Sequence, residues 1–191
     1  MRRRCVKRDD NGAILVNEFQ QTSNSTIYAT GDVTTNPEFV YVAAAGGAIA
    51  ARNALTDARQ ALDLSAMPAV IFTDPQIANV GLTEAQARQQ GYEVKASTLN
   101  LEYVPRAQAA RNTRGLIKLV ADTSTGRLLG VHVLAAEAGE VIQTATLAVK
   151  FGLTLDDLTT TLFPYLTQVE GLKLAALSFT KDIAKLSCCA S

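Results

Sequence analysis

The sequence lacks several features that would place it in particular classes of protein. Its 18 basic residues balance its 18 acidic residues, so we expect no electrostatic attraction to nucleic acid or to an anionic membrane. No apolar run approaches the length of a membrane span. The basic start, residues 1–5, is not followed by the apolar segment of a secretory signal. We therefore expect a cytoplasmic protein with no nucleic acid and no membrane as partner.

Cysteine and histidine are also scarce. The three cysteines, of which only Cys188 and Cys189 are neighbours, do not form a disulfide framework, which agrees with a reducing compartment. The one histidine, His132, lies far from them in the chain and is expected to be a structural strand residue. A zinc site would need four ligands, and the cysteine pair supplies two.

The residues that are present describe a globular protein of one domain and part of another, with 48% hydrophobic and 19% charged residues in a length of 191. Residues 1–60 do not make a complete domain, and end in a linker. They predict a short strand at 13–16, a buried strand at 25–29 and a helix that begins at about Val40. Gly46 and Gly47 each cost that helix about 1 kcal/mol relative to alanine, which indicates either close packing in a core or a ligand.

Residues 68–184 predict a second domain of the α+β class, a mixed sheet with packed helices. A flexible tail is expected at 185–191. The patterns predict a buried strand at 69–72, further strands at 94–101, 115–120 and 127–134, and helices at 83–91, 137–151, 155–162 and 170–184. The turn at 122–126 joins the last two strands into a hairpin.

Three groups of residues carry candidate chemistry. Gly31-Asp32 ends a predicted strand, where a carboxylate can accept hydrogen bonds from sugar-like hydroxyls, although an ordinary turn explains the pair as well. Tyr165 precedes the last helix and is a candidate site residue. The alternative is a structural role, as a buried tyrosine at the end of a helix. Cys188 and Cys189 are soft ligands for a soft metal ion; acylation, a disulfide with another chain or chance would also explain adjacent cysteines.

Together these residues resemble the mercuric reductase branch of the pyridine nucleotide–disulfide oxidoreductases. The segments that carry the resemblance lie at 28–32, 74–84, 163–170 and 170–189, and it covers nearly the whole chain from about Gly12. The wider family has His-Pro-Thr-x-x-Glu before the last helix. This chain keeps Thr167 and Glu170 but has Tyr165 and Leu166 where histidine and proline stand.

The resemblance implies both the fold and the site. Residues 1–60 would be the end of an FAD-binding domain, with Gly31, Asp32 and Val40 beside the cofactor, and 68–184 the dimerisation domain of a homodimer. Tyr165 and Glu170 would be catalytic. Cys188 and Cys189 would capture mercuric ion and deliver it to the partner's active site for reduction to elemental mercury by NADPH through FAD.

Three parts of that catalytic apparatus do not occur in the sequence. It contains no Gly-x-Gly-x-x-Gly loop, no Cys-x-x-x-x-Cys dithiol and no NADPH-binding domain. We therefore expect a fragment, a truncated gene product or a divided protein that is inactive by itself. The alternative is a non-catalytic dimerisation module that binds mercury through its tail.

Overall fold

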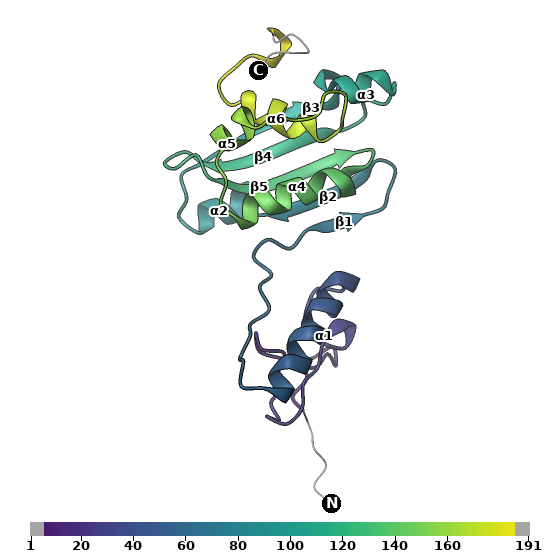
Figure 1. The fold of residues 1–191 in the computed structure, drawn as a ribbon, viewed down its shortest axis with the longest axis vertical. Coiled ribbons are helices and arrows are strands. Elements are labelled where there is room, and N and C mark those ends of the chain that lie inside the picture. Colours follow the sequence, from purple (N-terminus) through teal and green to yellow (C-terminus); the bar gives the residue numbers. More distant parts are fainter. Residues whose placement is uncertain (1–5, 186–191) are drawn as a thin grey trace, which may run out of the picture. The chain divides into compact units, whose positions relative to one another are not determined.

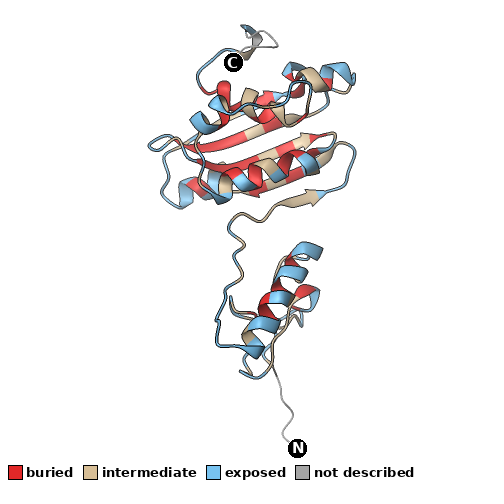
Figure 2. Ribbon diagram, in the orientation of Figure 1, coloured by how far each residue is buried: buried red, intermediate tan, exposed pale blue. Residues whose placement is uncertain are grey.

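The computed structural model describes residues 6–185. The chain divides into two compact units, with the boundary between Leu64 and Ser65. Figure 1 shows a small unit built around one long helix, and a larger unit built around a sheet. Each unit has its own buried residues (Figure 2). Among the described residues, no helix is long and apolar enough to cross a bilayer.

The first unit contains a short 3-10 helix, η1 (Gly31–Val33), and α1 (Val40–Leu55). The strands predicted at 13–16 and 25–29 are wrong, because residues there make isolated bridges such as Ile14 to Thr34 and Gln21 to Tyr28 rather than continuous ladders. Asn17 and Asn24 turn the chain between these bridges, their side-chain oxygens accepting backbone N–H bonds. Residues 25–29 are half-buried or exposed, not buried.

The helix predicted from Val40 is confirmed, and Gly46 explains part of its small-residue composition. A Cβ at Gly46 would lie 2.3 Å from Thr30 Oγ1 and 3.2 Å from Gln20 Oε1. At Gly47 the nearest atom would be Thr30 Cγ2 at 3.8 Å, an ordinary contact. Close packing is therefore sufficient to account for Gly46, and Gly47 has no comparable steric reason.

The second unit is built on a five-stranded sheet in the order β1-β2-β5-β4-β3. Its strands are β1 (Ala69–Ile71), β2 (Gln76–Gly81), β3 (Val94–Asn100), β4 (Leu116–Asp122) and β5 (Leu128–Ala135). The α+β class and the β4–β5 hairpin are confirmed, but every pairing is antiparallel, so the sheet is not mixed. The predicted burial of 69–72 is wrong, because β1 is an edge strand and Phe72 is 82% exposed.

Helices α4 (Ala138–Lys150) and α6 (Glu170–Leu177) cover one face of this sheet (Figure 1). Alternate strand residues point into that core, among them Ile117, Leu119 and Val131, all fully buried. The short helices η2 (Leu101–Tyr103), α3 (Pro105–Ala109) and α5 (Leu155–Thr160) complete this side. Helices α5 and α6 pack against each other, and this packing fixes both ends of the loop that joins them.

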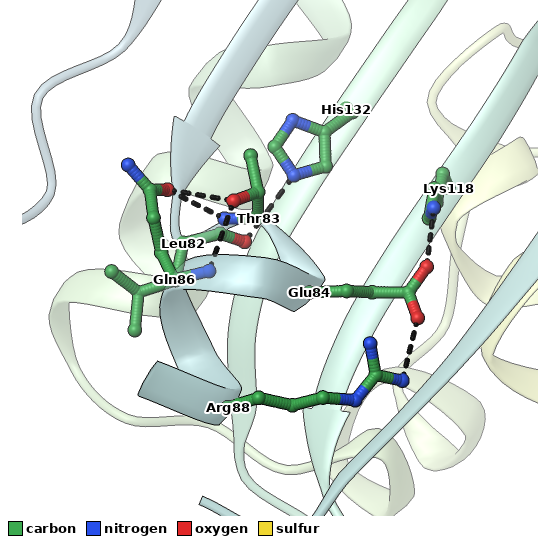
Figure 3. A network of polar contacts seen from close by, with 7 residues as sticks. All are labelled: Leu82, Thr83, Glu84, Gln86, Arg88, Lys118 and His132. Atoms are coloured by element: carbon green, nitrogen blue, oxygen red, sulfur yellow. Dashed lines mark hydrogen bonds and ion pairs between the residues drawn. The ribbon is translucent and has the colours of Figure 1, made fainter. Parts of the chain in front are cut away.

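The opposite face is more polar and is partly covered by α2 (Glu84–Gln89). Thr83 caps α2 in a capping box with Gln86. Glu84 binds Lys118 of β4 at 2.5 Å and Arg88 at 2.9 Å (Figure 3). The Lys118 contact attaches this helix of only six residues to the sheet, and the Arg88 contact lies within the helix.

The last helix is shorter than predicted. It ends at Leu177 rather than at 184, and a separate 3-10 turn, η3, follows at Ile183–Lys185. Ser178 Oγ donates to the Ala175 carbonyl at 2.7 Å, and Thr180 Oγ1 to the Leu177 carbonyl at 3.5 Å. Such side chains compete with the backbone for the last carbonyls of a helix, which favours its end here.

Candidate functional site

The loop between α5 and α6 presents Tyr165 on the surface of the second unit. Its side chain is 57% exposed, so the alternative of a buried tyrosine is wrong. Pro164 precedes it and lies outside both helices. A phenol in this position can accept and donate hydrogen bonds and can approach a soft metal ion, but it cannot take the acid–base role of an imidazole near neutral pH.

Glu170 is the first residue of α6 and contacts the tyrosine loop through the backbone. Its Oε2 accepts a hydrogen bond from the Leu166 N–H at 3.3 Å. Thr167 Oγ1 donates to the Pro164 carbonyl at 2.8 Å, which closes the same turn. The structure therefore brings Tyr165, Thr167 and Glu170 into one short segment, and the carboxylate bonds to the residue after the tyrosine.

The electrostatic setting of Glu170 differs from that of a solvated carboxylate. Burial raises the pKa of Glu170 above its ordinary value, while the Leu166 N–H and the charge of Lys173 act in the opposite direction. Desolvation penalises the ionised form, and hydrogen bonds to that form favour it. Here the desolvation is the larger effect.

Leu166 has a backbone conformation that sequence reasoning did not foresee. Its φ is +62°, in the left-handed region. Proline has a φ near −65° and cannot adopt this conformation. The replacement of proline by leucine in the family pattern was therefore the available signal, because it removes the restriction on φ at that position.

The residues predicted to lie beside FAD belong to the first unit. Gly31 has a φ of +75°, and its Cα packs so close to α1 that a Cβ would lie 3.3 Å from the Cβ of Ala43. This turn leaves Asp32 exposed. Val40 begins α1, is 86% exposed and has no side-chain cap before it. An exposed carboxylate and an uncapped helix N-terminus suit a polyhydroxylated, partly anionic cofactor.

The remaining candidates separate into two cases. Cys188 and Cys189 lie outside the described residues. His132 lies in β5, where its Nδ1 is 3.0 Å from Asn79 Oδ1 and its Nε2 is 3.3 Å from the Leu82 carbonyl oxygen (Figure 3 shows the second contact). Within residues 6–185 there is no cluster of three or more histidine, cysteine or acidic side chains that could hold a metal ion.

Comparisons with known proteins give consistent matches along the chain. Residues 67–176 match the model described as pyridine nucleotide-disulphide oxidoreductase, dimerisation domain. Residues 2–47 match the model described as pyridine nucleotide-disulphide oxidoreductase. Curated proteins named mercuric reductase from Lysinibacillus sphaericus and Staphylococcus aureus are 59% and 56% identical over 97% of this chain. The chain spans 34% of the length of each.

Solved structures give the same fold. The HOCl-induced flavoprotein disulfide reductase RclA from Escherichia coli aligns with a TM-score of 0.84 at 29% identity, over 92% of this chain and 40% of that one. LpdA from Mycobacterium tuberculosis aligns with a TM-score of 0.82 at 28% identity, over 92% of this chain and 38% of that one.

Proposed function

The chain belongs to the pyridine nucleotide-disulphide oxidoreductase family, and from this premise we propose that it is the C-terminal part of a mercuric reductase. The family resemblance expected from the sequence is confirmed by the matched regions and by the relatives named mercuric reductase. The single observation that supports the substrate is Tyr165, exposed in the loop where the wider family has histidine. The overall reaction transfers two electrons from NADPH to mercuric ion and gives elemental mercury, NADP⁺ and a proton.

The tail would supply the capture step. Two adjacent thiolates bind mercuric ion strongly because both ion and ligand are soft. Each exchange forms one new sulfur–mercury bond and releases one thiolate, so Cys188 and Cys189 can pass the ion to another dithiol without changing its charge. The exposed Tyr165 would then lie beside the ion during ligand exchange in the partner's site.

When bound, FAD would carry the electrons of NADPH toward the mercuric ion. In the first unit, Asp32 would accept hydrogen bonds from cofactor hydroxyls, and the turn at Gly31 would bring that carboxylate beside the start of α1 at Val40. We propose that the chain forms a homodimer, which the match of residues 67–176 to a dimerisation domain supports. We also expect the thiols of the tail to be reduced, as in the cytoplasm.

A chimera tests the proposed function directly. The C-terminal 34% of the Lysinibacillus sphaericus relative would be replaced by this chain, and NADPH oxidation would be followed with and without mercuric ion. We expect mercury-dependent oxidation. A chimera that folds and binds FAD but oxidises no NADPH in response to mercury would refute the proposal.

Variants of the active chimera separate the roles of the site residues. Cys188→Ser/Cys189→Ser should lower turnover at limiting mercuric ion at least tenfold, because delivery would lose both thiolates. Cys5→Ser is the matched control, since it removes a thiol outside the tail. Tyr165→Phe should lower turnover while leaving mercury capture unchanged. Equal turnover of the double serine variant and the control would remove the role assigned to the tail.

The isolated chain provides a second test. We predict that the 191-residue chain oxidises no NADPH in the presence of mercuric ion, because it carries neither the redox dithiol nor a nucleotide-binding loop. Mercury binding by the same sample, measured by competition with a chromogenic dithiol, should persist. Turnover by the isolated chain would contradict the prediction.

A further inference from the structure

The tyrosine loop contains an uncommon backbone conformation. Leu166 lies in the left-handed region at φ +62°, which residues other than glycine adopt rarely. A conformation of this kind persists when surrounding interactions hold it. Leu166 is itself 42% exposed, so packing of its side chain holds it only in part.

Two cavities adjoin the second half of the loop. A cavity of about 240 Å³ is lined by Thr167, Gln168 and Val169 on the loop side and by α4 on the other. A second cavity, of about 220 Å³, lies between Gln168 and α3. Hydrogen bonds therefore add to the restraint that buried Gln168 and the core contact of Val169 give this loop.

We propose that Glu170 is a positioning residue, whose carboxylate holds the Leu166 N–H and so keeps the loop in the turn that presents Tyr165. The bond length is 3.3 Å, and the acceptor sits on the first residue of α6, a helix anchored in the core by fully buried Leu172 and Ala175. The carboxylate on α6 thus holds the loop at the residue after the tyrosine. Only the role of Tyr165 rests on the proposed function.

The hydrogen bond from the Leu166 N–H is the principal polar contact of the Glu170 carboxylate. Lys173, on the same helix, is the cation whose charge lowers the pKa of Glu170, and its Nζ donates to the Thr161 carbonyl at 3.3 Å. The elements packed against α6 are α5, β3 and β4. Their charged residues have partners elsewhere or no resolved influence on Glu170: Lys95, Lys118, Asp122, Asp156 and Asp157. Burial raises the pKa of Glu170, so its carboxylate should take up a proton at a higher pH than an ordinary glutamate does.

Nuclear magnetic resonance of the ¹⁵N-labelled chain, without mercury, tests the proposal. The Leu166 amide shift should titrate with a midpoint above 4.5, the ordinary glutamate value. Glu170→Gln retains a neutral acceptor of the same size, so the amide should stop titrating while the rest of the spectrum is unchanged. Glu170→Ala should speed hydrogen exchange of this amide about tenfold. Leu166→Gly should restore the loop geometry in the alanine background, because glycine adopts positive φ readily.

Each of these results tests only the hydrogen bond between the Glu170 carboxylate and the Leu166 N–H. A Leu166 amide that does not titrate in the wild-type chain, or that titrates equally in Glu170→Gln, would overturn the proposal. If Glu170→Ala fails to fold, the comparison of wild type with Glu170→Gln still decides. An inactive chimera with a normal Leu166 titration would count against the mercury function but not against the positioning role of Glu170.

Discussion

Gly46 shows how a missing side chain sets the distance between two segments. Thr30, just before the turn at Gly31, approaches α1 so closely that a methyl group at Gly46 would overlap its hydroxyl at 2.3 Å. The Thr30 Oγ1 in turn donates to the Ala43 carbonyl at 3.4 Å. The helix accepts the conformational cost of glycine because the close approach places the Gly31-Asp32 turn against it.

We predict that Gly46→Ala destabilises the first unit by about 1–3 kcal/mol, the usual cost of overpacking. Gly47→Ala is the matched control and should stabilise α1 by up to about 1 kcal/mol, since alanine favours helix and meets no close atom. Urea unfolding followed by far-ultraviolet circular dichroism measures both. Adding Thr30→Ala to Gly46→Ala should recover part of the loss, and equal effects of the two glycine variants would contradict this account.

His132 is the second residue with a measurable consequence. Burial lowers its pKa below the ordinary value of 6.5, assisted by the charge of Lys118 and opposed by the Leu82 carbonyl. As pH falls below 6.5, the unfolded chain takes up a proton before the folded chain does. The stability that neutral His132 contributes is therefore fully present above pH 6.5 and lost as pH falls toward the lowered folded-state pKa.

We predict that the free energy of unfolding falls between about pH 7 and pH 5.5, and that His132→Gln reduces this slope. The chain has one histidine, so few other groups titrate in the interval. Urea unfolding at several pH values measures the effect. Parallel slopes for wild type and variant would show that His132 is not responsible.

At the scale of elements, α2 depends on its cap more than a long helix would. It has six residues, and Thr83 with Gln86 satisfies backbone donors at its start. Its one fully buried residue is Ala87, which removes little apolar area from water. Most of its stabilisation therefore comes from the cap and from Glu84. The pKa of Glu84 is lowered, and the hydrogen bond from Lys118 is the largest cause.

We predict that Thr83→Ala costs about 1 kcal/mol of stability, the usual value for a lost N-cap. Thr83→Ser keeps the hydroxyl and should behave as the wild type. Urea unfolding gives the difference, and hydrogen exchange of the Gln86 amide shows whether it arises at the cap. A loss of equal size in the serine variant would assign it to the missing methyl group instead.

The elements that sequence reasoning predicted well have strong local signals. The signals for the turn at 122–126, for the helix that begins near Thr83 and for α4 each lie within a few residues of the structure they specify. The predictions were wrong where the structure depends on residues that are distant in the sequence. Residues 25–29 have the composition of a strand but form a single bridge. Strand β1 lies at a sheet edge and is only partly buried, with Ile71 exposed. The Glu170–Leu166 bond could not be predicted, since it depends on a left-handed φ that no spacing reveals.

At the scale of the molecule, the second unit carries exposed apolar residues of the kind that oligomers bury. Leu147 and Phe151, one helical turn apart at the end of α4, are 48% and 71% exposed. The matched dimerisation domain covers both. A chain with such a surface is expected to associate with a second copy.

We predict a homodimer at micromolar concentration, with twice the 20.3 kDa mass of one chain. Light scattering coupled to size-exclusion chromatography measures the mass, and dilution should return the single-chain value. A 20.3 kDa species alone at micromolar concentration would contradict the prediction.

The left-handed backbone at Leu166 also restricts the evolution of this loop. A return to the His-Pro pair of the wider family requires two changes, at Tyr165 and at Leu166. Proline introduced first would meet a φ of +62° that its ring forbids, so that intermediate would lose the loop before it gained an imidazole. Histidine introduced first at Tyr165 leaves the turn at Leu166 unchanged. The left-handed turn therefore opposes proline at position 166 until the loop takes another conformation.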